Sequence, residues 1–235
     1  MKASKALTAI VILLSVSLLA GCNTKFSYSF KEEQALGDWI LEEYFLPSFV
    51  SNASPLVYAL HAFVPDKGLE LRQGGVTWPV MFKGDLTYKV RFYLKADETH
   101  PLFFSISMSD DTCHGDGSDL HLDVEDVGKP TERYALIEHE PSAMLMISPI
   151  DEYLPGLKRN GMNDFVLKKV GDMVEMRMNG AFIGEIKLEN YASEWFAPNI
   201  EVHTGGYAPD GVYGLIIEKV EVIYPKGNEA DLGTI

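Results

Sequence analysis

The segment "DFVLKKVGDMVEMRMNGAFIGEIKL", residues 164–188, constrains the fold of this chain most strongly. Its apolar residues alternate with polar ones, which is the pattern of a β-strand with one buried face. Two turns interrupt the alternation, Gly171-Asp172 and Asn179-Gly180. Asn-Gly is the strongest short-range signal for a two-residue hairpin. The segment is therefore predicted to form a three-stranded antiparallel meander.

Short strand-like runs recur along the rest of the chain. They are "FSYSF" (26–30), "LTYKVRFYLKA" (86–96), "LFFSISMS" (102–109), "LHLDVEDV" (120–127), "NIEVHTGGY" (199–207) and "GLIIEKVEVIYP" (214–225). Helical periodicity is nearly absent, and the best helix candidate, residues 32–45, is interrupted by Gly37 and could equally carry a strand. We expect one all-β domain over residues 26–225, a two-sheet antiparallel β-sandwich of the jelly-roll type. A closed barrel is the alternative, and residues 226–235 form a polar tail.

The N-terminus has the order of parts of an export signal. Lys2 and Lys5 precede an apolar centre that is too short for a membrane span and ends in "LAGC", residues 19–22. A cysteine after Leu-Ala-Gly resembles the bacterial lipobox, which implies removal of residues 1–21 and lipidation of Cys22, with residues 22–25 as a tether. An ordinary secretory signal is the alternative. By resemblance to sorting rules, Asn23 favours the outer membrane, so we expect an exported, lipid-anchored protein.

The charge of the mature chain limits its partners. Loss of residues 1–21 leaves 18 Lys and Arg against 34 Asp and Glu, a formal charge of −16. A domain this acidic is not expected to bind nucleic acid or anionic lipid, and no phosphate-binding loop suggests a nucleotide. Cys113 is the only cysteine besides Cys22, and a lipidated Cys22 has no thiol left to pair with it. No internal disulfide is therefore expected.

Three segments together resemble the concanavalin A-like lectin and glucanase superfamily, which includes family 16 glycoside hydrolases and laminin G-like domains. They are "FKGDLTYKVRFYLKADETHPLFFSISMSDD" (82–111), the meander 164–188 and "GLIIEKVEVIYP" (214–225). The resemblance implies a concanavalin A-like jelly roll and a carbohydrate as the ligand or substrate. It remains an analogy at the level of the fold.

In family 16 hydrolases the catalytic strand reads Glu, apolar, Asp, apolar, Glu. The matching residues here are His121-Leu122-Asp123-Val124-Glu125, so the resemblance carries over Asp123 and Glu125 but puts a histidine where the nucleophile belongs. An imidazole cannot form the usual glycosyl ester. Asp123 and Glu125 could still act as acid and base, because residues two apart in a strand share a face. Enzyme activity is therefore left open, with binding favoured.

The same strand can be interpreted without catalysis. Leu120, Leu122 and Val124 would point into the core, and His121, Asp123 and Glu125 would line the opposite face. In the superfamily that polar face is commonly the concave one, which makes it a candidate sugar cleft.

Sugar sites also need aromatic rings on which a pyranose can stack. Trp78, Trp195 and Tyr207 lie in loop-like surroundings where a ring could be exposed, although each could instead cap the core. His203 could face the same cleft as His121, or be a surface residue without a role.

An acidic loop offers a metal site as a separate hypothesis. Asp110, Asp111, Asp116 and Asp119 in "SDDTCHGDGSD" could bind calcium, although acidic loops are usually only solvated. Zinc binding by Cys113, His114 and His121 has no recognisable ligand spacing.

Three functions remain at this point. The first is a lipid-anchored module that binds a carbohydrate or glycoconjugate without hydrolysing it. The second is a glycoside hydrolase-like enzyme that uses Asp123 and Glu125. The third is a structural or partner-binding lipoprotein.

Overall fold

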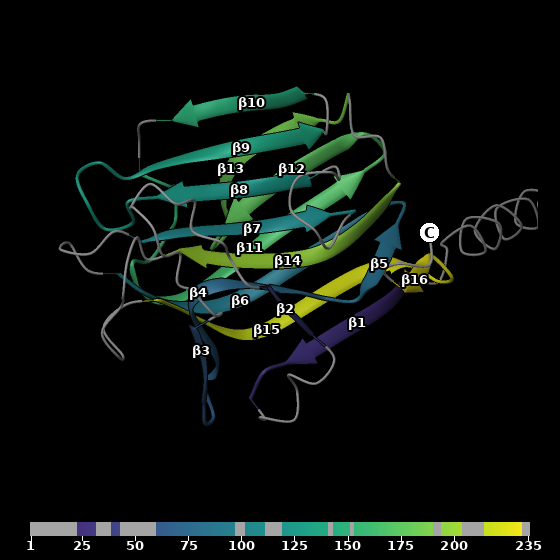
Figure 1. Cartoon of the computed structure of the whole chain (residues 1–235). Coiled ribbons are helices and arrows are strands. Elements are labelled where there is room, and N and C mark those ends of the chain that lie inside the picture. The colour runs from purple at the N-terminus through teal and green to yellow at the C-terminus, as the bar shows by residue number, and fades with distance from the viewer. Residues whose placement is uncertain are drawn as a thin grey trace, which may run out of the picture.

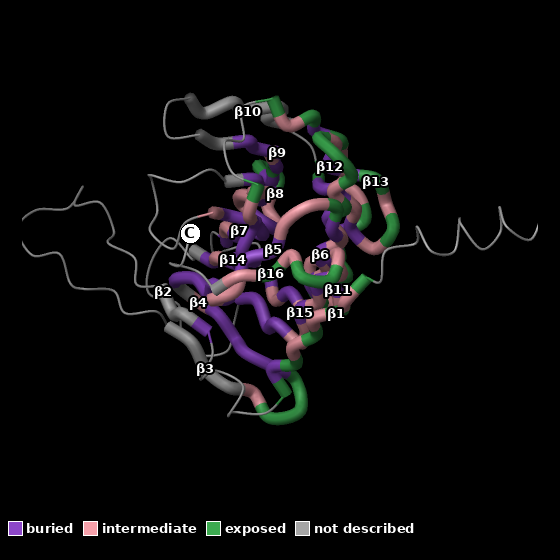
Figure 2. The backbone as a smooth tube through the Cα atoms, turned by 90° about the vertical axis from the view of Figure 1, so that its right-hand side faces the viewer, coloured by how far each residue is buried: buried purple, intermediate pink, exposed green. Residues whose placement is uncertain are grey.

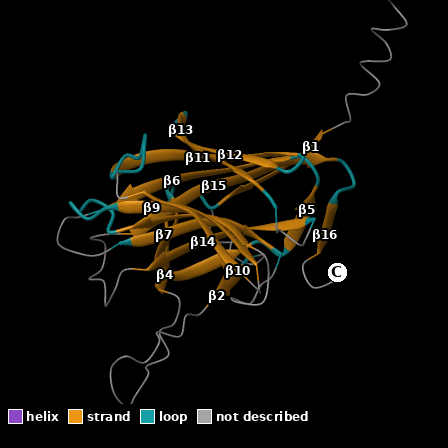
Figure 3. Cartoon of the chain, turned by 90° about the horizontal axis from the view of Figure 1, so that it is seen from above, coloured by secondary structure: helices purple, strands orange, loops and turns teal. Residues whose placement is uncertain are grey.

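The computed structural model describes residues 23–31, 39–42, 60–96, 102–110, 119–140, 143–150, 153–189, 194–203 and 214–231. These residues form sixteen β-strands and no helix (Figures 1 and 3). The described part of the chain therefore holds no helix able to cross a membrane.

The strands form two antiparallel sheets packed face to face (Figure 2). Sheet I has the order β10 (Ala143–Ile150), β9 (Arg133–Glu140), β8 (Asp119–Glu125), β7 (Phe103–Ser109), β14 (Trp195–His203), β4 (Gly68–Thr77), with β2 (Ile40–Glu42) paired to β4. Sheet II has the order β13 (Ala181–Lys187), β12 (Met173–Met178), β11 (Asn160–Val170), β6 (Leu86–Lys95), β15 (Gly214–Pro225), with β1 (Asn23–Ser29) paired to β15 and β3 (Leu60–Val64) to β4. Two short strands, β5 (Val80–Lys83) and β16 (Glu229–Asp231), pair with each other and join the start of β14.

Strand β4 belongs to both sheets. Leu69 and Leu71 pair with β15 in sheet II, whereas residues 74–77 pair with β14 in sheet I. Gly74, with a φ of 93°, lies at the crossing, and glycine tolerates this backbone conformation where a strand must bend. The two sheets are thus continuous through β4. The strand order of the described residues begins at β10 and ends at β13 without a pairing between these two strands, so the closed-barrel alternative is wrong.

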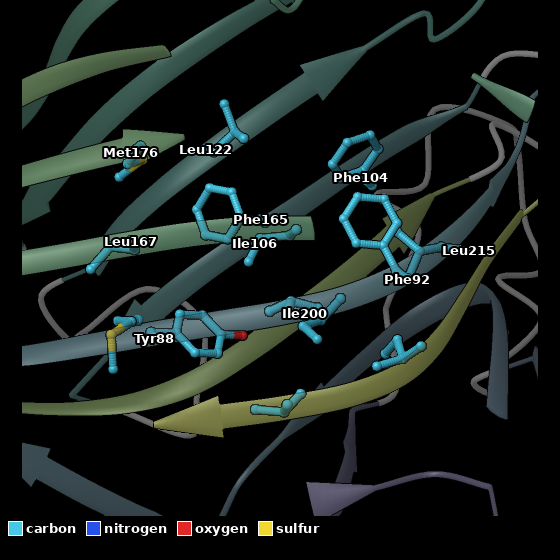
Figure 4. Packing of buried hydrophobic residues seen from close by; sticks show 14 of the residues in the cluster. Tyr88, Phe92, Phe104, Ile106, Leu122, Phe165, Leu167, Met176, Ile200 and Leu215 are labelled. Carbon is cyan, nitrogen blue, oxygen red and sulfur yellow. The ribbon is translucent and has the colours of Figure 1, made fainter. Parts of the chain in front are cut away.

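The core lies between the sheets (Figure 4). Tyr88 and Phe92 of β6 are fully buried, as are Phe104 of β7 and Phe165 of β11. The Phe92 and Phe104 ring centroids are 5.7 Å apart, so rings of the two sheets contact each other directly. This interdigitation confirms the predicted two-sheet sandwich.

The predicted meander is confirmed as β11, β12 and β13. At its second turn Asn179 and Gly180 have φ values of 50° and 82°, the positive values that favour Asn-Gly in a two-residue hairpin. Of the helix candidate 32–45, Trp39 is a buried residue in a bend, residues 40–42 form strand β2, and residues 32–38 and 43–45 lie outside the described residues.

The expected domain boundaries differ from the strands at both ends. Residues 23–25, expected to be a tether, are the first residues of β1 and pair with residues 223–225. Residues 229–231, expected to be part of a polar tail, pair with β5. Both segments are polar, and they form strands because they extend existing edges, a long-range effect that their composition does not reveal.

The outer face of sheet II carries ion pairs that should make stability depend on pH. Burial alone would raise the pKa of Glu221, but hydrogen bonds and charges from Lys219 and Lys25 outweigh burial and lower this pKa from 4.5 to about 2. A carboxyl with a depressed folded pKa stabilises the fold above its unfolded pKa and loses that contribution as the pH falls towards the folded pKa. The Glu221→Gln variant should therefore lose less stability than the wild-type protein as the pH falls from 4.5 to about 2. Urea denaturation at each pH measures the free energy of unfolding.

The matched control is Glu185→Gln, which changes an exposed carboxyl on β13 of the same sheet. If Glu221→Gln lost as much stability as the wild-type protein between pH 4.5 and about 2, the lowered pKa of Glu221 would not be the cause of that loss.

Candidate functional site

Strand β8 places its residues as the alternation predicts. Leu120, Leu122 and Val124 are fully buried in the core. His121, Asp123 and Glu125 lie on the other face of sheet I and are partly exposed. The predicted alternation of this strand is confirmed.

His121 and Asp123 form the centre of this face. The His121 Nδ1 lies 2.9 Å from a carboxylate oxygen of Asp123 and 3.4 Å from the Ser105 Oγ of the neighbouring strand β7. Asp123 and Ser105 thus meet the same ring nitrogen. A catalytic triad places the nucleophile and the orienting carboxylate on opposite nitrogens. The arrangement fixes the imidazole ring but does not form a Ser-His-Asp relay.

Glu125 has a different partner. It lies opposite Arg133 in the pairing of β8 with β9, and the Arg133 guanidinium forms an ion pair with its carboxylate. Glu125 would have to give up this ion pair in order to hold the proton that a general acid donates. The two carboxylates carried over from the hydrolase motif are therefore engaged separately, Asp123 by a histidine and Glu125 by an arginine.

The strand register brings further polar residues to this face. Ser107 and Asn199 continue the row of His121, and Ser105 and Glu201 continue the row of Asp123. The two serines and Asn199 are largely buried, whereas Glu201 is partly exposed. Sequence reasoning missed these residues. The alternating serines of "FSISMS" were a usable signal, but only the pairing of β7 with β14 brings Glu201 beside them.

Trp78 does not provide an exposed ring. Its side chain is only 8% exposed, and its centroid lies 4.7 Å from that of Phe26 and 5.1 Å from that of Trp39. The expected platform role of Trp78 is corrected by this packing: rings from β1 and from the segment before β2 enclose it. Trp78 caps the core, as the alternative proposed.

Trp195 is partly exposed at the start of β14, and the Lys83 ammonium lies 4.7 Å from its ring centroid. It lies four residues along β14 from Asn199, and β14 is two strands from β8. From strand spacings, Trp195 is therefore roughly 16 Å from His121. A single sugar ring cannot contact both, but an oligosaccharide can.

Several predicted site residues are only partly described or lie outside the described residues. His203 ends β14 opposite Phe103, and Asp119 begins β8 opposite Ser109. The side chains of His203 and Asp119 are not described. Those outside the described residues are Cys22, Asp111, Cys113, His114, Asp116 and Tyr207.

The calcium hypothesis stays a prediction. Asp110 follows the end of β7 and is partly buried. Among the residues that the structure describes, no group of three or more His, Cys, Asp or Glu side chains is arranged to hold a metal ion. The other three expected ligands have no described side chain.

Comparison with known proteins identifies the fold. No protein family and no curated protein matches the sequence. Among solved structures, the chain is similar to the CBM2 module of an evolved Dit protein from Lactobacillus casei BL23 phage J-1, with a TM-score of 0.60 and 11% identity over 86% of this chain and 96% of that one.

Two mycobacterial structures are also similar. A glycoside hydrolase family protein from Mycobacterium thermorestibile has a TM-score of 0.58 and 12% identity over 84% of this chain and 99% of that one. A beta-1,3-glucanase from Mycobacterium marinum has a TM-score of 0.56 and 10% identity over 84% and 97% of the two chains. The chain therefore has the jelly-roll fold found in glucanases and carbohydrate-binding modules.

Proposed function

We propose that this protein is a lipid-anchored bacterial surface protein whose sheet I binds a carbohydrate or glycoconjugate without hydrolysing it. The observation that carries the proposal is the His121–Asp123 pair, with a 2.9 Å contact on the outer face of β8. In the related hydrolase pattern this strand carries the reactive carboxylates. Here it presents an oriented imidazole and a carboxylate, groups that hydrogen-bond sugar hydroxyls.

Two features favour binding over hydrolysis. A retaining glycosidase needs a carboxylate nucleophile, and His121 occupies that position. The second required group is a carboxylic acid, whereas Glu125 is held by Arg133. The partly exposed His121, Asp123 and Glu201 are nevertheless suited to hydroxyl groups, because an imidazole can donate or accept a hydrogen bond and a carboxylate accepts one.

The charge of the protein narrows the glycan class. The formal charge of −16 after removal of residues 1–21 repels acidic polysaccharides. Neutral glycans avoid this repulsion. Trp195 offers a partly exposed aromatic ring on the same strand as Glu201, and a glycan of several units would be needed to contact both Trp195 and His121.

The anchor is part of the proposal. The pattern "LAGC" at residues 19–22 supports lipidation of Cys22, and Asn23 directly after it supports the outer membrane as the destination. Several acyl chains on one cysteine hold a protein far better than one chain does. The binding face would then be displayed at the bacterial surface.

A glycoside hydrolase-like enzyme is the second candidate, because Asp123 and Glu125 share a face on a fold that glucanases use. One experiment separates the two functions. The purified protein is incubated with a panel of β-glucans and host glycans, and both equilibrium binding and release of reducing sugar are measured. We expect saturable binding of a glycan without turnover.

Two outcomes would reject the binding proposal. Release of reducing sugar that Glu125→Gln abolishes would establish the enzyme instead. Absence of binding to every glycan in the panel would favour a structural or partner-binding lipoprotein.

A further inference from the structure

A groove of about 440 Å³ lies beside the start of β14, and none of the residues that line it belongs to β8. Its lining includes Lys83, Lys169, Asp172, Glu194, Phe196 and Asn228, and we call it the lysine groove. The residues come from β5, the end of β11 and the turn after it, the start of β14 with the residue before it, and the segment before β16.

Lys169 and Lys83 both line this groove, and the ammonium group of each has a partner nearby. The Lys169 Nζ donates a hydrogen bond to the Gly84 carbonyl at 3.3 Å and lies 5.5 Å from the Phe196 ring centroid. The Lys83 Nζ lies over the Trp195 ring. Burial lowers the pKa of Lys169, while the charges of Asp85, Glu194 and Asp172 act to raise it. An anion in the groove would stabilise the charged form of this lysine further.

The groove also carries negative charge. Asp172 and Glu194 line it and are exposed to solvent. Asp172 also lies 4.0 Å from the Lys187 ammonium, and nearby Asp85 accepts a hydrogen bond from the Gly171 N–H at 2.8 Å. Two cations and two carboxylates in one groove do not favour a simple anion. They complement a zwitterion that carries both a phosphate and an ammonium group.

The groove lies close to the expected lipid anchor. Lys83 and Asn228 exchange two hydrogen bonds, from the Lys83 N–H to the Asn228 carbonyl at 3.0 Å and from the Asn228 Nδ2 to the Lys83 carbonyl at 3.2 Å. The Asn228 N–H bonds the Pro225 carbonyl, and Pro225 pairs with Asn23 at the start of β1. Figure 1 shows β5 and β16 at the end of the sandwich where β1 begins.

No flexible linker separates Cys22 from this end of the fold, because β1 begins at the next residue. We infer that this end of the sandwich faces the bilayer and that the lysine groove binds a zwitterionic phospholipid headgroup. The phosphate lies between Lys83 and Lys169, and the headgroup ammonium lies at Asp172 and Glu194. The orientation rests on the anchor proposed above, whereas headgroup binding can be tested without it.

The test titrates the detergent-solubilised full chain with glycerophosphoethanolamine and follows binding by calorimetry. Inorganic phosphate and ethanolamine serve as the separate halves of the zwitterion. We expect saturable binding of glycerophosphoethanolamine that is at least 10-fold tighter than that of either half. Lys83→Met combined with Lys169→Met should weaken it at least 10-fold. Lys168→Met, an exposed lysine next to the groove lysine in sequence, should leave it unchanged.

Three results would overturn the inference: no saturable binding, equal binding of inorganic phosphate, or unchanged binding in the double variant. Thermal melting of each variant shows whether it is folded, and the single variant Lys83→Met replaces the double variant if Lys169→Met unfolds the protein. Labelling with palmitate of bacterial cells that produce the protein tests the lipid anchor separately. The glycan panel on the same sample tests the β8 site, so failure of the groove and failure of the proposed function are distinguished.

Discussion

Glu132→Gln is expected to lower the free energy of unfolding by about 3 kcal/mol, since breaking a buried ion pair typically costs 3–5 kcal/mol. The Glu132 side chain is fully buried and forms an ion pair with Arg159. The same carboxylate accepts hydrogen bonds from the Gly128 and Leu154 N–H groups at 2.9 and 3.3 Å. We place the cost at the low end because the Arg159 side chain remains 30% exposed and can be solvated by water.

The position of Glu132 explains why one side chain should matter this much. It precedes β9 in sheet I, whereas Leu154 and Arg159 lie in the segment that leads into β11 of sheet II. Glu132 therefore ties the two sheets together at the end of the sandwich where β8 ends. Loss of the carboxylate removes a charge partner and weakens the acceptor of two N–H groups at once.

Differential scanning calorimetry provides the measurement, with an expected decrease in Tm of roughly 6–12 °C for a domain of this size. Glu175→Gln is the matched control, because Glu175 also binds an arginine, Arg177, but does so in solvent on β12. Exposed ion pairs contribute little, so the control should leave Tm almost unchanged. Equal effects of the two variants would show that the burial of Glu132 has no special role.

The parts of the fold that the sequence predicts are those set by local pattern. The Asn179-Gly180 turn and the alternation in β8 need only neighbouring residues, because turn chemistry and the period of a strand act over a few positions. The bend of β4 at Gly74 and the pairing of residues 23–25 with β15 depend on strands more than 100 residues apart along the chain. Local propensity cannot reveal such pairings.

The candidate site divides in the same way. The shared face of His121, Asp123 and Glu125 was predictable, because it follows from the strand period. The ion pair between Glu125 and Arg133 depends on the β8–β9 register. The burial of Trp78 depends on the aromatic residues of β1 that pack on it. Both alter the chemistry that was expected: the first engages one presumed catalytic carboxylate, and the second removes one presumed sugar platform.

The largest functional effect is expected at the His121–Asp123 pair. Asp123→Asn removes the charge that orients the imidazole, and His121→Ala removes the imidazole itself. Hydrogen bonds to charged groups contribute about 1.5–3 kcal/mol, so each variant should weaken glycan binding about 10- to 100-fold. The measurement is the dissociation constant for whichever glycan the panel identifies.

The contrast with a control variant decides whether such a loss is local. Asp164→Asn makes the same chemical change at an exposed position on sheet II, where Asp164 lies 3.7 Å from Arg91. The Asp164→Asn control should leave glycan affinity unchanged. Asp123→Asn and His121→Ala should retain the wild-type Tm, because His121 and Asp123 lie outside the core. If Asp123→Asn bound glycan as tightly as the wild-type protein, the outer face of β8 would not be the binding site, whatever sugar the fold recognises elsewhere.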